Sequence, residues 1–251
     1  MTHQISIIIP VLNEVEIIGN LLSYLSNNST ATHISEIIVV DGGSTDGTLD
    51  LVRSFSKIDH TEKTNSIANS KLKHQPNIIL IDSLKGRAKQ MNLGAKNAQG
   101  NILYFLHADS FPPKDFDQFI INEVQKGNKA GCFRMQFDSN HWWLRLASWL
   151  TQFSWRACRG GDQSQFITKE LFDDIGGYDE NYIIYEDNIL INELYARQEF
   201  KVINKKLKNS ARLYRTHGVW NLQYHFWTIY VKKWLGASAE DLLAYYNKHI
   251  H

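Results

Sequence analysis

Polar and charged side chains follow four successive apolar runs in the first half of the chain. A single acid after a strand is commonly only a helix cap, but four consecutive strand ends with polar groups indicate a binding site. Such groups could bind a charged ligand or a cation. In chain order they are Asn13 and Glu14, then Asp41, then Gly86 and Arg87, then His107, Ala108 and Asp109.

The chemistry of these groups fits a nucleoside diphosphate that is bound without a glycine cradle. The place of a dinucleotide-binding G-x-G-x-x-G motif holds Val11-Leu-Asn-Glu14, and no G-x-x-x-x-G-K-[ST] run exists. Without such a cradle, the diphosphate charge must be met by a metal ion or by arginines. Asp109 suits a hard cation, and Arg87 can supply bidentate contacts.

The elements that must position these residues alternate between strand and helix patterns. We predict an α/β fold with a mostly parallel central sheet, helices on both faces and further helices at the C-terminus. Asp46 is placed to cap the second helix. A polar surface loop is expected over 57–77. The predicted strands are Ile5–Pro10, Glu36–Val40, Ile78–Ile81 and Ile102–Leu106, and the predicted helices are Glu14–Ser26, Leu49–Phe55 and Ala88–Ala98.

All seven tryptophans lie in the second half of the chain, between Trp142 and Trp234. Trp142, Leu146, Trp149, Leu150 and Phe153 share one helical face, and Trp220, Trp227 and Trp234 share another. A last helix is predicted over Ala239–Tyr246. The aromatic faces fit three interpretations: packing in the core or against a second copy in a homodimer, peripheral contact with a membrane surface, or stacking on a sugar. The segment that carries the first face also contains three arginines and no acidic residue. The arginines are Arg145, Arg156 and Arg159.

The bulk composition is that of an ordinary folded protein of 251 residues. The net charge of +1 gives no sign of a nucleic-acid partner. Two cysteines are too few for a disulfide framework. Neither a signal peptide nor a membrane-spanning run is recognised. We therefore expect a cytoplasmic protein, with the inner face of the membrane as an alternative location.

Several ordered motifs resemble the family-2 glycosyltransferases with the A-type fold. The resemblance covers roughly residues 4–215, and the order of its motifs is specific although each is weak alone. Its motifs are Ser6-Ile-Ile-Ile-Pro-Val-Leu-Asn-Glu14, Ile38-Val-Val-Asp-Gly-Gly-Ser-Thr-Asp-Gly-Thr48, Gly86-Arg-Ala-Lys-Gln-Met-Asn-Leu-Gly-Ala95, Gly176-Gly-Tyr-Asp179 and Glu186-Asp187.

The resemblance implies a role for each matching residue. Asp41, with Gly43 in the same motif, matches the acid that contacts the nucleotide base, and Pro10, Asn13 and Glu14 match the loop around base and ribose. Arg87 matches a basic residue near the nucleotide. Asp109 matches the last acid of the D-x-D motif, which binds a metal bridging the diphosphate. Glu186 and Asp187 match the E-D pair, whose aspartate is the base in inverting members.

One residue departs from the family pattern, because His107 stands where the first acid of D-x-D is expected. A branch of the family with His-Ala-Asp at this place is the nearest match. We still expect a divalent cation, Mn²⁺ or Mg²⁺, on Asp109, with His217 as a candidate additional ligand. Arg212 and Arg215 are candidate diphosphate contacts. Gly161, Asp162 and Gln163 form a candidate acceptor or sugar loop.

The resemblance implies a metal-dependent glycosyltransferase that uses a nucleotide-sugar donor, with UDP favoured, and inverts the anomeric carbon. The acceptor is unknown, and a lipid-linked one is an option. We expect an A-type domain over 1–215, with a nucleotide half (1–110) and an acceptor half (111–215), followed by a helical extension (216–251). Two alternatives are a nucleotidyltransferase of similar fold and a catalytically degenerate nucleotide-sugar-binding or scaffold protein.

Overall fold

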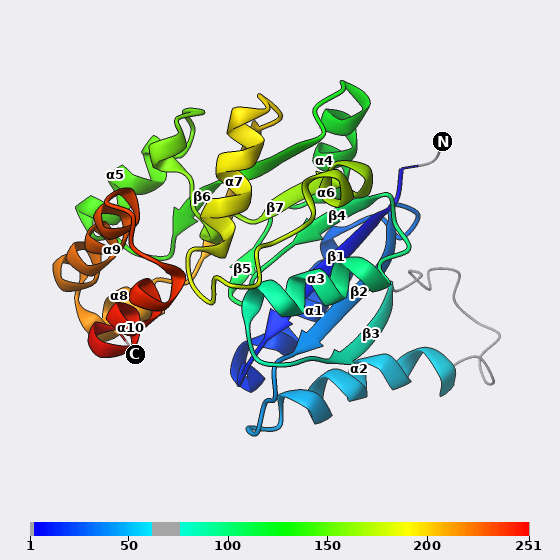
Figure 1. Ribbon diagram of the computed structural model, residues 1–251. Coiled ribbons are helices and arrows are strands. Elements are labelled where there is room, and N and C mark those ends of the chain that lie inside the picture. The colour runs from blue at the N-terminus through cyan, green and yellow to red at the C-terminus, as the bar shows by residue number, and fades with distance from the viewer. Residues whose placement is uncertain (1–2, 62–75, 251) are drawn as a thin grey trace.

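A single sheet of eight strands organises the computed structural model, which describes residues 3–61 and 76–250 (Figure 1). The strand order is β3-β2-β1-β4-β7-β6-β8-β5. The strands are β1 (Ile5–Val11), β2 (Ile34–Asp41), β3 (Asn77–Asp82), β4 (Ile102–Phe105), β5 (Ser110–Phe111), β6 (Ala130–Phe137), β7 (Gln165–Thr168) and β8 (Lys201–Asn209).

Helices cover both faces of the sheet, as expected (Figure 1). They are α1 (Val15–Asn28), α2 (Thr48–Thr61), α3 (Arg87–Asn97), α4 (Phe116–Gln125), α5 (Trp142–Leu150), α6 (Lys169–Ile175), α7 (Glu186–Ala196), α8 (Arg212–His217), α9 (Val219–Trp234) and α10 (Ala239–His249). Two 3₁₀ turns, η2 (Arg156–Cys158) and η3 (Gly161–Gln163), precede β7.

The first four strands in sequence are parallel, which confirms the predicted α/β half. Because alternate residues of a strand point to opposite faces, Ile7 and Ile9 pack with α1, whereas Ile8 packs with α3. Both faces of β1 are therefore buried, which explains its unbroken apolar run. Gly94 lets α3 approach closely, since a Cβ there would lie 2.5 Å from Ile8.

The second half continues the sheet with a change of direction. β7 pairs antiparallel with β4 and with β6, and β6 pairs parallel with β8. The backbone ladder between β4 and β7 is the seam that joins the two halves. It pairs four residues of each strand, from Ile102 with Thr168 to Phe105 with Gln165.

The C-terminal helices pack on the segment that precedes α7. Leu222, Ile229, Leu242 and Ile250 form a small core, and Tyr182 packs against it. Figure 1 shows α8, α9 and α10 beside α5 at one end of the sheet. No helix in the described ranges is long and apolar enough to span a bilayer.

One sequence prediction needs correction. α2 continues to Thr61, so the predicted loop starts later than residue 57, and its residues 62–75 lie outside the described part of the chain. The predicted helices over the tryptophans form. Of the interpretations of their aromatic faces, burial in the core is the one that the exposure of the rings excludes. Trp142, Trp149, Trp220 and Trp227 are all about half exposed or more.

Candidate active site

The predicted strand ends meet at one edge of the sheet. Val11 pairs with Asp41 in the parallel register, and Asp41 pairs with Asp82. Asp41 is buried, and its Oδ2 accepts hydrogen bonds from the backbone N–H groups of Gly43 (2.8 Å) and Ser44 (2.9 Å). Its Oδ1 has no partner among the described residues. A buried carboxylate oxygen without a partner is costly, so this atom is suited to accept a bond from a ligand.

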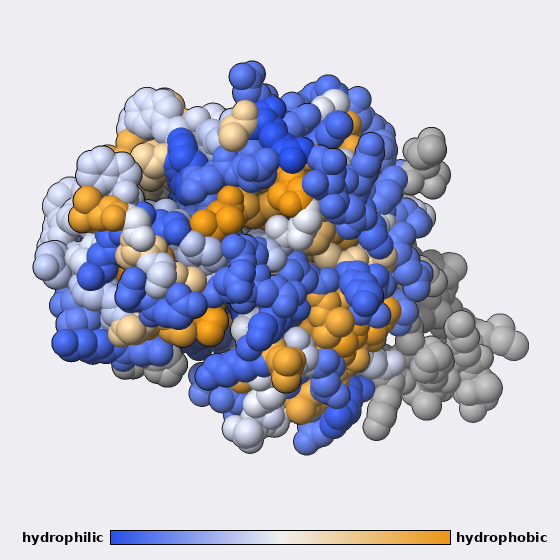
Figure 2. Space-filling view, in the orientation of Figure 1, coloured by the Kyte–Doolittle hydropathy of each residue, from blue (hydrophilic) through white to orange (hydrophobic). Residues whose placement is uncertain are grey.

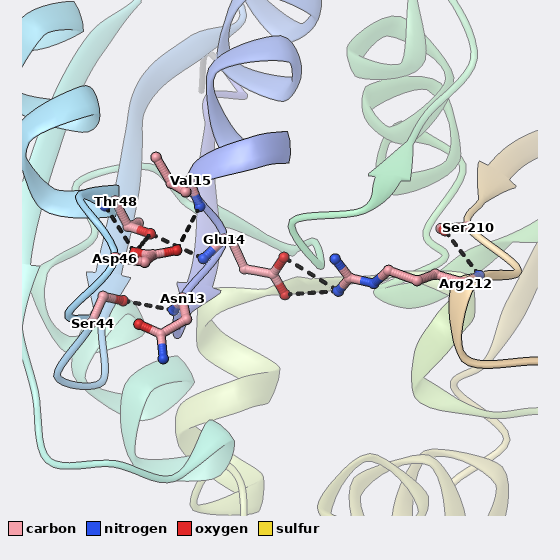
Figure 3. A network of polar contacts seen from close by, with 8 residues as sticks. All are labelled: Asn13, Glu14, Val15, Ser44, Asp46, Thr48, Ser210 and Arg212. Carbon is pink, nitrogen blue, oxygen red and sulfur yellow. Dashed lines mark hydrogen bonds and ion pairs between the residues drawn. The ribbon is translucent and has the colours of Figure 1, made fainter. Parts of the chain in front are cut away.

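Hydrogen bonds lock the loop after β1 to the loop after β2 (Figure 3). Asn13 adopts a positive φ of 55°, its N–H donates to Ser44 Oγ at 2.8 Å, and its Oδ1 accepts from Thr45 N at 2.8 Å. Asp46 accepts from the backbone N–H of Thr48 at the start of α2 and from that of Val15. The predicted capping acid therefore also ties α1 to α2. Pro10 lies at the end of β1, just before this loop.

Gln90 is a residue of this edge that the sequence analysis missed. Its buried amide donates to the carbonyl of Val11 at 2.9 Å and to that of Val40 at 2.7 Å. It thus fastens α3 to the ends of β1 and β2. A polar residue inside a helix gives no such signal from sequence alone, because its partners are far along the chain.

The E-D pair begins α7, immediately after Tyr185, which has a positive φ of 72°. Arg87 Nη1 lies 3.2 Å from Glu186 Oε1 and 3.7 Å from Asp187 Oδ2. Glu186 is almost fully buried, whereas 12% of the Asp187 side chain is exposed. Of the two acids, Asp187 is the one that solvent or a substrate can reach.

Glycine at position 161 allows η3 to approach Asp187. A Cβ on Gly161 would lie only 1.8 Å from Asp187 Oδ2. This close approach brings the predicted loop and the E-D pair together, and it places Asp162 within the electrostatic influence of Asp187 and Asp109. Three acids from three distant segments therefore form one cluster.

The pKa values of these acids reflect burial and mutual repulsion. Burial, followed by repulsion from Glu186, raises the pKa of Asp187 to about 7, although Arg87 opposes the rise. Asp162 is open to solvent on one side but crowded by protein atoms. This crowding and the charge of Asp109 raise its pKa to about 6. An acid with a pKa near neutrality is suited to proton transfer.

Asp109 is influenced by two cations, Arg87 of α3 and Arg212 of α8. Burial raises its pKa, whereas Arg212 and Arg87 lower it. Arg212 Nη2 also lies 3.4 Å from Glu14 Oε2, so Glu14 points across the site toward α8 (Figure 3). Burial and Arg87 lower the pKa of His107 to about 3, which keeps its imidazole neutral. Ala108 between them is buried.

The acids around Asp109 fit a hard divalent cation. They repel one another, and carboxylate oxygens are the ligands that Mg²⁺ and Mn²⁺ prefer. The described residues form no group of three or more His, Cys, Asp or Glu side chains arranged to hold a metal. Mg²⁺ commonly uses one or two carboxylates together with substrate phosphates, so the residues fit a cation that binds with the donor.

The remaining predicted residues are placed less centrally. His217 ends α8, and Arg215 pairs with Asp138 at 3.1 Å. The structure does not bring the Gln163 side chain to the site surface. It is buried, and its amide binds Arg159 at 2.5 Å and the carbonyl of Cys158 at 2.6 Å.

Tyrosines from the C-terminal helices complete the surroundings of Asp162. Tyr214 of α8, Tyr230 of α9 and Tyr246 of α10 each have a pKa that burial raises and that the charge of Asp162 raises further. These residues were missed because no strand end or motif marks them. The segment predicted as an extension therefore borders the candidate site.

Comparisons with known proteins agree with this geometry. The sequence profile described as "Glycosyl transferase family 2" matches residues 6–179. The "Dolichyl N-acetyl-alpha-D-glucosaminyl phosphate 3-beta-D-2,3-diacetamido-2,3-dideoxy-beta-D-glucuronosyltransferase" of Methanococcus voltae is 24% identical over 231 residues, which cover 88% of this chain and 66% of the relative.

Two solved structures share the fold. The mannosyltransferase PcManGT from Pyrobaculum calidifontis, in complex with GDP-Man and Mn²⁺, has a TM-score of 0.62 at 18% identity, covering 91% of this chain and 61% of that chain. S. aureus TarS 1–349, in complex with UDP, has a TM-score of 0.61 at 17% identity, covering 83% and 60%. The chain thus spans about two thirds or less of these proteins.

The predicted fold is confirmed by these structural neighbours. The family match extends from β1 to the Gly176-Gly-Tyr-Asp179 motif, and it includes the strand-end residues, Arg87, Asp109 and the Gly161–Asp162 loop. The chain belongs to glycosyl transferase family 2.

Proposed function

We propose that the protein transfers a sugar from a nucleoside-diphosphate donor to an acceptor hydroxyl, with inversion at the anomeric carbon. The observation that carries this proposal is the position of Asp187. This acid is close to Arg87 and to the Gly161–Asp162 loop. It therefore stands where a base would meet an acceptor hydroxyl beside the cations that receive a diphosphate.

Asp187 acts as the general base. Its raised pKa, about 7, leaves a substantial fraction ionised at neutral pH and gives the carboxylate enough basicity to accept a proton. It takes the proton of the acceptor hydroxyl while the oxygen attacks the anomeric carbon. The bond from that carbon to the diphosphate breaks, and the nucleoside diphosphate leaves with the electron pair. One displacement inverts the configuration.

The donor nucleoside lies along the edge formed by the β1 and β2 loops. Asp41 Oδ1 is unpartnered among the described residues and accepts a bond from the base. Pro10, Asn13 and Gly43 border the base and ribose. The hydrogen bonds between Asn13 and the β2 loop hold this edge rigid before the donor arrives, which lowers the entropic cost of binding.

The leaving diphosphate is bound from two sides. Arg87 approaches from α3, and Arg212 approaches from α8, with Arg215 one turn further along α8. A divalent cation held by Asp109, with His217 as a candidate second ligand, would offset the negative charge of the leaving group. PcManGT, a structural neighbour, binds Mn²⁺, and this supports the choice of Mn²⁺ or Mg²⁺.

The acceptor we favour is lipid-linked, because the Methanococcus voltae relative is named for a dolichyl-linked acceptor. Asp162 and the three tyrosines around it form the acceptor side. UDP is our preferred nucleotide, although the two structural neighbours bind UDP and GDP-Man respectively. Hydrolysis of UDP- and GDP-sugars side by side distinguishes the two donor bases.

A donor-hydrolysis panel tests the proposal. Purified protein is incubated with UDP- and GDP-sugars in Mn²⁺ and in EDTA, and the released nucleoside diphosphate is measured. We expect release with one nucleotide class, loss of release in EDTA, and a large decrease in Asp187→Asn. Release that is indifferent to both EDTA and this substitution would contradict the mechanism.

Two further readouts separate the alternatives. Thermal stabilisation by donor and Mn²⁺ without any turnover would favour a binding protein over an enzyme. With an acceptor in hand, the anomeric configuration of the product decides the stereochemistry, and retained configuration would exclude a single displacement.

A further inference from the structure

Two helices carry a continuous row of large side chains that no other described part of the chain covers. Trp142 is 60% exposed, Trp149 51% and Trp234 84%. In Figure 2, pale residues, the class to which Trp and Tyr belong on this scale, gather at the left margin over α5 and α9. We call this surface the aromatic face; it consists of Trp142, Leu146, Trp149, Trp220, Tyr224, Trp227, Val231 and Trp234.

The aromatic face is one surface and not two separate stripes. The rings of Trp142 and Trp220 lie 5.7 Å apart, and the half-buried Trp143 contacts both Trp220 (5.5 Å) and Trp227 (5.7 Å). The indole N–H of Trp143 donates to Gln223 at 3.0 Å. These contacts fix α5 against α9, so the exposed rings are held together.

A groove of about 760 Å³ opens beside α5 and combines three cations with this face. Its lining includes Arg134 of β6, Lys206 of β8 and Arg145 of α5, together with Trp142, Leu146 and Trp149. No acidic residue of the described chain lines it. Asp138 lies next in sequence to the lining residues Phe137 and Ser139, but its carboxylate is paired with Arg215 at 3.1 Å.

The three cations lack a partner of opposite charge. None of them has an ion pair among the described residues. Arg134 Nη1 donates to the neutral Asn204 Oδ1 at 2.8 Å, and Arg134 Nε is buried without a hydrogen-bond partner in the described part of the chain. Arg134 and Lys206 are paired neighbours in the parallel register of β6 and β8. Like charges directly opposite on adjacent strands repel each other, so an anion between them would be stabilising.

We propose that the aromatic face lies in the interfacial layer of a membrane that contains anionic phospholipid, and that the groove binds a lipid phosphate between Arg134, Arg145 and Lys206. Indole rings prefer the boundary between headgroups and acyl chains. Arginine and lysine next to the rings bind the phosphates of the same layer.

The charges favour a bilayer over a second copy of the chain. A two-fold dimer through the aromatic face would bring the same surface from each subunit together, including the uncompensated cations of both grooves. α5 and α9 contain no Asp or Glu that could pair with them. An anionic lipid surface supplies the missing charge, and it also covers the exposed rings.

Vesicle flotation with the full chain tests the proposal. We expect binding to vesicles of phosphatidylcholine with phosphatidylglycerol, weaker binding to phosphatidylcholine alone, and loss of binding at high salt. The double variant Arg145→Gln/Lys206→Gln should bind about fivefold more weakly for each charge removed. The double variant Trp142→Ser/Trp149→Ser should bind vesicles about tenfold more weakly for each ring removed.

Two controls match these variants. Lys201→Gln removes an exposed cation from the other end of β8, and Leu84→Ser removes an exposed apolar side chain after β3. Both should bind vesicles as the unchanged protein does. All variants should stay folded by circular dichroism and keep their donor hydrolysis, so a failure here is distinguishable from a failure of the proposed activity.

Quenching of tryptophan fluorescence by brominated acyl chains adds a measure of ring insertion. It should occur in the unchanged protein and decrease in Trp142→Ser/Trp149→Ser.

Four results would overturn the proposal. They are no binding to either vesicle, equal binding to both vesicles, a dimer that Trp142→Ser/Trp149→Ser dissociates while vesicles stay unbound, and stabilisation by inorganic phosphate without vesicle binding. The third would assign the face to a second copy, and the fourth would assign the groove to free phosphate.

Discussion

The charge on Arg87 should set the pH at which the protein becomes active. The base role requires ionised Asp187, whose pKa burial and Glu186 raise to about 7, while Arg87 opposes this rise. Activity should therefore be low below pH 7, where Asp187 is protonated, and should increase as pH rises through this value. Replacing Arg87 by Gln removes the opposing charge, so the midpoint should move to higher pH.

The distance gives the size of this shift. Arg87 Nη1 and Asp187 Oδ2 are 3.7 Å apart, for which Coulomb's law gives roughly 1 kcal/mol in a water-like dielectric and roughly 4 kcal/mol at an effective dielectric of about 20. Because 48% of the Arg87 side chain is exposed, the water-like value is the better guide. About 1 kcal/mol corresponds to about one pH unit.

The assay is kcat/KM for donor consumption as a function of pH, because this parameter reports ionisations of the free enzyme. Near pH 7, the kcat/KM of Arg87→Gln should be about fivefold lower because less of Asp187 is ionised. This part of the decrease should disappear by about pH 9. Any weaker diphosphate binding lowers the whole curve without moving its midpoint.

The matched control is Lys89→Gln. It also removes a cation from the first turn of α3, but this cation is not paired with Glu186 or Asp187. Its midpoint should equal that of the unchanged protein. An unchanged midpoint in Arg87→Gln, or an equal shift in Lys89→Gln, would refute the assignment of Asp187 as the base that Arg87 tunes.

Four other substitutions probe the site and its support. Gly161→Ala places a Cβ 1.8 Å from Asp187 Oδ2, so turnover should fall about 100-fold, as a displacement of about 1 Å can cost, with an unchanged circular dichroism spectrum. Asp162→Asn should raise the melting temperature above pH 6 but not below pH 4. In the folded protein the pKa of Asp162 is raised from 3.8 to about 6, so the unchanged protein loses stability as the pH rises through this interval. The melting temperature should rise by roughly 2–4 °C for each kcal/mol gained in the free energy of unfolding, a gain that solvent screening of Asp162 reduces. Asp109→Asn should weaken the Mn²⁺-dependent part of donor binding about 100-fold or more, measured by thermal shift, because losing even an outer partner of a metal ligand costs 10–100-fold. Gln90→Leu removes two buried hydrogen bonds to the strand-end carbonyls of Val11 and Val40, which should lower the free energy of unfolding by about 1–3 kcal/mol in urea titration.

The first half of the chain, residues 1–110, could be predicted from the sequence because its structure depends on local patterns. β1 is apolar on both faces, and α1 has a regular apolar stripe at Ile18, Leu21, Leu22 and Leu25. Each pattern has one interpretation, and parallel strands then bring their ends to one edge. The positions of Asp41 and Asp109 followed from that rule.

The segment over 111–215 could not be predicted in the same way. β8 carries Lys201, Lys205, Lys206 and Lys208, and most of its residues are exposed, so it has no apolar run to mark it as a strand. β6 contains Gly131 in close contact with the backbone of Lys201, a feature visible only after the strands pair.

The residues around Asp162 depended on contacts between distant segments. Tyr246 reaches the site only because α10 packs on the segment before α7. The exposure of the tryptophans likewise followed from tertiary packing, because helical spacing shows which residues share a face but not whether that face is covered.

The two halves are held together very unequally. On the sheet, a backbone ladder joins β4 to β7. Across the site, Glu14 meets Arg212, a residue 198 positions away, through one exposed ion pair of 3.4 Å, a contact worth about 0–1 kcal/mol. The contact between Glu14 and α8 can therefore open without breaking the sheet, while Arg87 still joins α3 to Glu186 and Asp187. Under the proposed function, a diphosphate that reached Arg212 would replace Glu14 as its anionic partner, and the donor would enter and leave without disturbing the sheet.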